Sequence, residues 1–243
     1  MKKFGFTFVK VDRVPSPRGR ARVGVGQKSA FTLAEILITL GVIGVVAAMT
    51  MPTVIQNYQK QNVVSKLKKT YTTLNQALKL SEIDNSEYKY WDNSLDARDY
   101  FEKYWKPYLK VVKICQTSLD CGYKSDLPFK TIKGAPELTS VVYPTSRTTF
   151  ILNNGILVIM TLRGGDNMTD PLQSVIIDIN ASNPPNMFGK DVFRFERNEK
   201  GLLYPYRYDL SENDINSGCN LSGYYCSAKI MHDGWKISDD YPW

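Results

Sequence analysis

The segment from Ile36 to Ile55 reads ILITLGVIGVVAAMTMPTVI and carries no formal charge over its twenty residues. A helix rises about 1.5 Å per residue, so a helix of this length covers ~30 Å, the thickness of the hydrocarbon core of a bilayer. A buried helix of a soluble protein normally keeps a polar face, and this segment has none. The segment therefore predicts a membrane-spanning helix.

Two residues depart from this apolar pattern. Glu35 lies at its start, where a carboxylate is costly at membrane depth unless it is paired, and costs little at the level of the lipid headgroups. Pro52 lies near its end. Because proline has no backbone N–H and clashes with the preceding turn, we expect it to kink the helix or open it locally.

The segment 1–30 ahead of the apolar run is strongly basic. It holds eight Lys and Arg residues and one Asp, which accounts for the whole net charge of +7 and leaves 23 basic and 23 acidic groups on the rest of the chain. A basic flank before an apolar segment is the charge pattern of an export signal, because cytoplasmic Lys and Arg hold that end inside. A basic tail ahead of a simple membrane anchor is the alternative. The neutral body lacks the basic footprint of a nucleic-acid-binding protein.

The junction of these two segments has a specific order of residues. KSA at residues 28–30 is followed by FTLAE at residues 31–35 and then by the apolar run. This order resembles the cleavage and methylation segment of type IV pilins and of the pseudopilins of type II secretion. The resemblance implies that a prepilin peptidase cuts between Ala30 and Phe31, and that the new amine of Phe31 is methylated. It covers about residues 28–60.

The same resemblance assigns a role to Glu35, which stands at the family's fifth-position glutamate. In a filament the apolar helices bundle, and a carboxylate there can pair with the cationic amine of a neighbouring subunit, which offsets the desolvation of both charges. Many pilins also carry a helix-breaking proline at the place of Pro52. The chain departs from the family pattern at Ala30, where glycine is usual.

The chain becomes amphipathic after Pro52. Five residues recur at spacings of three and four and predict one apolar stripe on a helix that extends to about Ile83: Val64, Leu67, Tyr71, Leu74 and Leu78. A second helix is expected over 95–108, capped by Ser94 or Asp96. Strands are expected over 148–152, 156–162, 175–179 and 192–195, with Asn153-Asn154-Gly155 as a hairpin turn.

These elements predict an α+β fold, in which a long N-terminal membrane-spanning and amphipathic helix packs against an antiparallel β-sheet head, as in pilins. The expected organisation is a basic prepilin leader over 1–30, a transmembrane and assembly helix over 31–55, an amphipathic helical stalk over 56–83, and a globular α+β head over 84–243.

Four cysteines stand in two close pairs, Cys115 with Cys121 and Cys219 with Cys226. The cysteines of each pair are further apart in sequence than those of typical zinc sites. An exported head would lie in an oxidising compartment, which favours disulfides. Four cysteines allow about three connectivities. The two local loops are the first choice because short loops close easily, and reduced cysteines are the alternative.

Oxygen-bearing side chains cluster in the sequence between residues 178 and 191. Such oxygens bind calcium, and some pseudopilin heads bind it, so Asp178, Asn180 and Asp191 are candidate calcium ligands. The spacing matches no defined calcium loop, and turn formation is the alternative. No other cofactor is expected, and no catalytic motif pairs with the single His232, so the sequence predicts no enzyme.

We therefore expect a structural subunit, a pseudopilin of a type II secretion-like pseudopilus that supports protein export. It is expected in the bacterial inner (cytoplasmic) membrane as a single-pass protein with its head on the extracytoplasmic side. The implied partners are prepilin peptidase, other pilin or pseudopilin subunits, and an inner-membrane assembly platform; no nucleic acid is expected. The alternatives are a minor type IV pilin for adhesion or DNA uptake and, from another class, a membrane-anchored binding protein or enzyme.

Overall fold

The computed structural model describes residues 32–143, 145–162, 172–197 and 200–243. The chain divides into two units, Met1–Met49 and Thr50–Trp243. Helix α1 (Leu33–Asn85) begins in the first unit and continues into the second, with Pro52 inside it. The expected long helix is therefore present, and it ends two residues beyond the predicted Ile83.

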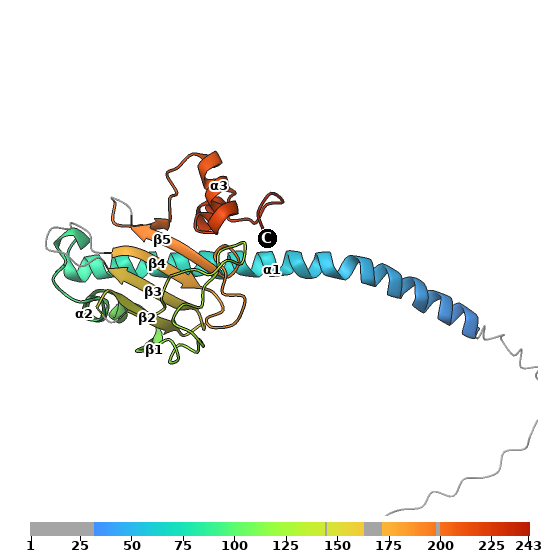
Figure 1. The fold of residues 1–243 in the computed structure, drawn as a ribbon, viewed down its shortest axis with the longest axis horizontal. Coiled ribbons are helices and arrows are strands. Elements are labelled where there is room, and N and C mark those ends of the chain that lie inside the picture. Colours follow the sequence, from blue (N-terminus) through green and yellow to red (C-terminus); the bar gives the residue numbers. More distant parts are fainter. Residues whose placement is uncertain (1–31, 144, 163–171, 198–199) are drawn as a thin grey trace, which may run out of the picture. The chain divides into compact units, whose positions relative to one another are not determined.

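The second unit is built on a six-stranded antiparallel sheet in the sequential order β1 to β6 (Figure 1). The structure thus confirms the α+β class with a long N-terminal helix and an antiparallel sheet. The strands are β1 (Val111–Cys115), β2 (Arg147–Leu152), β3 (Leu157–Leu162), β4 (Leu172–Asp178), β5 (Val192–Arg197) and β6 (Leu203–Pro205).

The hairpin between β2 and β3 forms where the sequence predicts it. Its turn closes with the N–H of Gly155 donating to the Leu152 carbonyl at 2.9 Å, and Gly155 has φ +79°. An L-amino acid with a side chain rarely adopts this left-handed conformation, so glycine is the natural residue there. Strands β1 and β6 were not among the expected strands.

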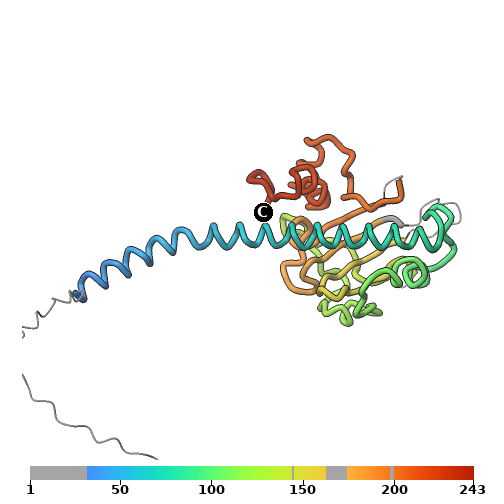
Figure 2. The backbone as a smooth tube through the Cα atoms, turned by 180° about the vertical axis from the view of Figure 1, so that it is seen from behind, coloured from blue at the N-terminus to red at the C-terminus, as the bar shows by residue number. Residues whose placement is uncertain are grey.

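One face of the sheet packs on the second half of α1. Leu67, Leu74 and Leu78 of α1 are fully buried in the same core as Phe150 of β2 and Phe193 of β5. Figures 1 and 2, which view the molecule from opposite sides, both show α1 running along this face. The apolar stripe predicted from the sequence is therefore the core face of α1, with Tyr71 half-buried at its margin.

Helix α2 (Ala97–Tyr104) covers the same face, and its Phe101 ring stacks on Phe150 at 4.3 Å between centroids. The Asp96 side chain caps α2 by accepting the N–H of Asp99 at 2.8 Å. The predicted helix over 95–108 is too long: α2 gives way to a 3₁₀ turn (Lys106–Tyr108). Pro107 explains the difference, because proline cannot donate to the preceding turn and disfavours a helical residue before it.

The opposite face of the sheet is covered by irregular chain instead of a helix. A second core forms there around Ile159 and Ile176, with Tyr123, Phe129 and Phe188 packed over them. The aromatic rings of this layer meet edge to face, at 5.7 Å for Tyr123 with Phe129 and 5.8 Å for Phe129 with Phe188. The head is therefore a sheet with helices on one side and a loop layer on the other.

Two short helices follow β6, and the sequence analysis did not predict them. Helix α3 (Glu212–Ser222) is capped by Ser211 and ends at Gly223 with φ +86°. A Cβ on Gly223 would lie 2.2 Å from the Phe188 carbonyl oxygen, so glycine is required both by the conformation and by this close approach. Helix α4 (Cys226–His232) then packs against β5, with the Ser227 hydroxyl donating to the Arg194 carbonyl at 2.6 Å.

Candidate functional site

The first part of α1 exposes its apolar side chains around the whole helix. Thirteen large apolar residues between Leu33 and Ile55 are 44–74 % exposed, and no part of the most apolar window is buried. Transferring that many side chains out of water is worth on the order of 20 kcal/mol, more than the roughly 5–15 kcal/mol that holds a typical domain together. This is the one described helix that is long and apolar enough to cross a membrane.

The carboxylate of Glu35 is engaged within its own helix. Its Oε2 accepts both the backbone N–H and the hydroxyl of Thr32 at 2.8 Å, and the Thr32 hydroxyl in turn accepts the N–H of Glu35 at 3.2 Å. This reciprocal arrangement is a capping box, which satisfies N–H groups that the first turn of a helix leaves unpaired. In the single chain, the Glu35 carboxylate is therefore satisfied by Thr32 of the same helix.

One edge of the sheet is closed by a side chain of α1. The amide of Asn75 accepts the N–H of Leu203 at 2.9 Å and donates to the carbonyl of the same residue at 3.2 Å. Leu203 belongs to the edge strand β6, so the amide occupies the hydrogen-bonding groups that an added strand needs. An open edge is a template for pairing with another chain, and Asn75 removes this one.

The other edge, β1, carries two features that oppose strand pairing. Its register with β2 shifts between Val111 and Lys113, and Lys113 places its ammonium 2.6 Å from the Asp120 carbonyl beside the strand. A bulge and a lysine are common devices for protecting an exposed edge. Both edges of the sheet are thus poorly suited to strand addition.

The structure forms the two local disulfides that the spacing favours. Cys115–Cys121 closes the loop after β1, with the Cα atoms 5.6 Å apart. Cys219–Cys226 joins α3 to α4, with the Cα atoms 4.5 Å apart, and both cysteines are fully buried. No described cysteine is left free.

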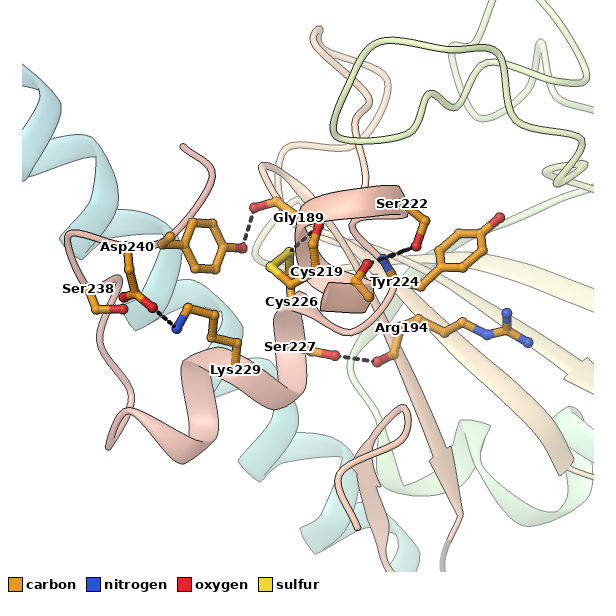
Figure 3. The surroundings of a disulfide bond; sticks show 12 residues. Gly189, Arg194, Cys219, Ser222, Tyr224, Cys226, Ser227, Lys229, Ser238 and Asp240 are labelled. Atoms are coloured by element: carbon orange, nitrogen blue, oxygen red, sulfur yellow. Dashed lines mark hydrogen bonds and ion pairs between the residues drawn. A yellow bond between two sulfur atoms is a disulfide. The ribbon is translucent and has the colours of Figure 1, made fainter. Parts of the chain in front are cut away.

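Contacts around Cys219–Cys226 connect the helical corner to the end of the chain. Lys229 of α4 is buried and pairs with Asp240 at 2.6 Å, and the Tyr241 hydroxyl donates to the Gly189 carbonyl. Figure 3 shows Lys229 and Asp240 on one side of the disulfide and Arg194 on the other. The C-terminal segment is therefore part of the head's packing.

The structure brings together the three residues considered as calcium ligands. Asp178 is fully buried and accepts the Tyr123 hydroxyl at 2.6 Å and the Asn180 N–H at 3.2 Å. Asp191 accepts the N–H groups of Met187 at 2.6 Å and of Asn186 at 2.8 Å. Each of the four carboxylate oxygens thus has a protein donor, which is the geometry of turn formation. In the described part of the chain, no three acidic, His or Cys residues form a metal-binding group; calcium binding stays a prediction.

Burial is the main influence on these two acids. It raises the pKa of Asp178 well above the ordinary value, and the nearby charge of Asp191 adds to the effect, while the hydrogen bond from Tyr123 opposes it. Burial likewise raises the pKa of Asp191, opposed by its backbone hydrogen bonds. Desolvation disfavours the charged form, so burial favours the protonated form of both acids.

Residues 53–243 match a family of unknown function (DUF6613). The chain belongs to this family. No curated protein and no solved structure matches the chain. The match starts within α1, just beyond the start of the second unit, so the DUF6613 region includes the whole head together with the part of α1 that packs on it. The KSA-FTLAE junction at residues 28–35 and most of the apolar run lie before the DUF6613 region.

The structure describes some of the predicted site residues and not others. Ala30 and Phe31, the expected cleavage residues, lie outside the described residues, so their processing stays a prediction. Glu35 lies in the first turn of α1 and Pro52 inside it, where the helix continues through the proline.

Two residues that were not selected from the sequence contact Glu35 and strand β6. Thr32 forms hydrogen bonds with Glu35. The sequence does contain a signal for this contact, because threonine followed three residues later by glutamate is a capping-box pattern. Asn75 closes β6 within the DUF6613 region from 128 residues away in the chain, and no local pattern reveals such a contact.

Proposed function

We propose that this chain is a pilin-like structural subunit, most specifically a pseudopilin that is cut before Phe31, methylated and assembled through its apolar helix. The observation that carries the proposal is the start of α1, where a single acid, Glu35, heads a charge-free helix whose apolar side chains are exposed on every side. Such a helix needs a bilayer before assembly and a bundle of like helices after it.

Three further features support an extracytoplasmic assembling subunit over an enzyme. The basic residues ahead of α1 orient it with the leader inside. Two disulfides suit an oxidising compartment. Both sheet edges are poorly suited to strand addition, which favours association through helices.

The capping box gives the assembly step a specific form. In the free subunit Glu35 holds the N–H and hydroxyl of Thr32. In the assembled state its carboxylate pairs with the cationic amine of a neighbour's Phe31, because a buried charge without a partner is strongly unfavourable. Leaving the capping box costs less than burying an unpaired carboxylate, so pairing with the amine lowers the cost of placing Glu35 in the bundle.

The experiment separates the charge of Glu35 from its capping role. The full chain is expressed with its peptidase and assembly partners, and filaments are counted by electron microscopy. Glu35→Gln keeps an oxygen for the Thr32 donors but removes the charge, and we expect it to insert normally and fail to assemble. Thr32→Val removes the hydroxyl but keeps the charge, and we expect assembly to continue.

Two results oppose the proposal. Assembly by Glu35→Gln with failure by Thr32→Val assigns Glu35 to helix capping alone. A mass spectrum of membrane-extracted protein that retains residues 1–30, in cells with active prepilin peptidase, removes the pilin-like function altogether. The cellular position of the filaments, on the surface or confined to the envelope, then separates a pilin from a pseudopilin.

A further inference from the structure

A groove lies between α1 and the C-terminal segment within the second unit. Its volume is about 510 Å³, and its lining includes Lys60, Gln61 and Val64 on one side and Trp235, Lys236 and Ile237 on the other. Val64 lies four positions after Lys60 and three after Gln61, so it shares a helix face with both. We call this cavity the juxtamembrane groove.

The juxtamembrane groove is cationic. Lys60 and Lys236 line it, and the ammonium of Lys68 lies 5.8 Å from the centre of the Trp235 ring. None of the described lining residues is acidic, and neither Lys60 nor Lys236 forms an ion pair with a described carboxylate. Two acids of the C-terminal region, Asp233 and Asp240, pair with Lys229.

Trp235 is held in place by the fold. It has φ +62°, an uncommon conformation for a bulky residue, and its N–H donates to the Ile230 carbonyl at 2.8 Å. Its ring packs on Tyr71 of α1 at 5.3 Å between centroids. A strained residue persists only where surrounding contacts over-determine it, so the indole wall of the groove is preformed.

The depth of the groove follows from the helix rise. The charge-free run of α1 ends at Ile55, and Lys60 lies five residues further along the same helix in the second unit. At about 1.5 Å per residue this separation is ~8 Å. The headgroup layer occupies about 5–8 Å on each side of the hydrocarbon core. Lys60, and Trp235 across the groove, therefore fall at the outer edge of the headgroup layer, where Trp and Lys are common and a long lysine side chain can reach a lipid phosphate.

We propose that the juxtamembrane groove binds the phosphate of an anionic phospholipid, with Lys60 and Lys236 as the ammonium ligands and Trp235 packed along the glycerol region of the same lipid. This inference rests on the membrane-spanning part of the proposed function and adds a ligand to it. Bound lipid holds the head against the membrane at a set depth, and a subunit that enters a filament must release it.

The experiment places the full chain in lipid nanodiscs of phosphatidylcholine, with brominated phosphatidylglycerol or brominated phosphatidylcholine added in increasing amounts. Bromine quenches tryptophan fluorescence at close range, and Trp235→Phe identifies the part of the signal that belongs to the groove. A lysine near an anionic surface favours binding by about fivefold, so two lysines give a preference for phosphatidylglycerol of about thirtyfold. We expect Lys60→Gln with Lys236→Gln to abolish that preference.

The matched control is Lys79→Gln with Lys110→Gln, which removes the same charge from two exposed lysines outside the groove. It is expected to keep the preference. Equal quenching by the two lipids, or an equal loss in both double variants, overturns the inference. Inorganic phosphate added to the nanodiscs tests for a free anion: if it abolishes quenching by phosphatidylglycerol, the ligand is phosphate and not lipid, which also overturns the inference.

Alkaline extraction of membranes separates this inference from the proposed function. A chain that resists extraction but shows no lipid preference refutes the lipid site and leaves the membrane-spanning subunit intact. A chain that is released by alkali contradicts the membrane anchoring on which both depend.

Discussion

Replacing Asn75 by alanine tests whether a single amide closes the edge of the sheet. The substitution removes the acceptor for the Leu203 N–H and the donor to its carbonyl, which lie at 2.9 and 3.2 Å. Leu203 is 1 % exposed, so these backbone groups have little access to water. A buried backbone group left without a partner costs about 1–3 kcal/mol.

The two groups together give an expected loss of about 2–4 kcal/mol, because partial access to water or a small shift relieves some of the penalty. For a unit of this size each kcal/mol lowers the melting temperature by about 2–4 °C. We therefore expect Asn75→Ala to melt roughly 4–16 °C below the wild type. The measurement is thermal unfolding of the full chain in detergent, followed by near-ultraviolet circular dichroism.

The control is Gln76→Ala, an exposed polar residue next to Asn75 on the same helix, which we expect to change the melting temperature little. An unprotected β6 also becomes available for strand pairing, so Asn75→Ala is expected to increase concentration-dependent association of the heads. Equal melting temperatures for the two variants, with no added association, refute the reasoning that this amide closes β6.

Three further predictions concern the disulfides and the buried acids. Replacing Cys219 and Cys226 by serine is expected to lower the free energy of unfolding by about 2.5 kcal/mol from the closed-loop entropy, measured by thermal unfolding; stability unchanged from the wild type counts against a structural role for the bridge. Burial raises the pKa of Asp178 above its value in the unfolded chain. The contribution of protonated Asp178 to the free energy of unfolding is therefore full below the unfolded-state pKa of about 4, and it is lost as pH rises through the folded-state pKa. Asp178→Asn is therefore expected to flatten the decline of melting temperature with rising pH, and identical slopes in the two proteins contradict this. The hydrogen bonds accepted by Asp178 and Asp191 favour turn formation, the alternative to calcium binding, so we expect calcium and a calcium chelator to give the same melting temperature; a rise with calcium supports the calcium ligands predicted from the sequence.

The helix and the central strands could be predicted because their signals are local. The apolar run, the stripe from Val64 to Leu78 and the Asn-Asn-Gly turn each act within a few residues, and the structure places them as expected. The edge strands β1 and β6 were missed because they are short and their stability depends on a neighbour. β6 has three residues and is held on its free side by Asn75.

Helices α3 and α4 were missed for another reason. Polar residues such as Asn213, Asn216 and Asn220 weaken the helical pattern of α3, and only Ser211 at its start and Gly223 at its end mark the element. The disulfide from Cys219 to Cys226 and the packing on β5 stabilise this region. The roles expected for Ala30 and Phe31 depend on a peptidase and on neighbouring subunits, so chemistry outside the single chain decides them.

The close approach of Gly223 to Phe188 has a consequence for variation in the family. A methyl group at position 223 would meet a backbone oxygen, which cannot rotate away as a side chain can. Random mutagenesis of the head should therefore find almost no tolerated substitution there, for steric and conformational reasons alone. A related sequence with any other residue at this point should be expected to carry a rebuilt corner, with α3 entering α4 along a different path.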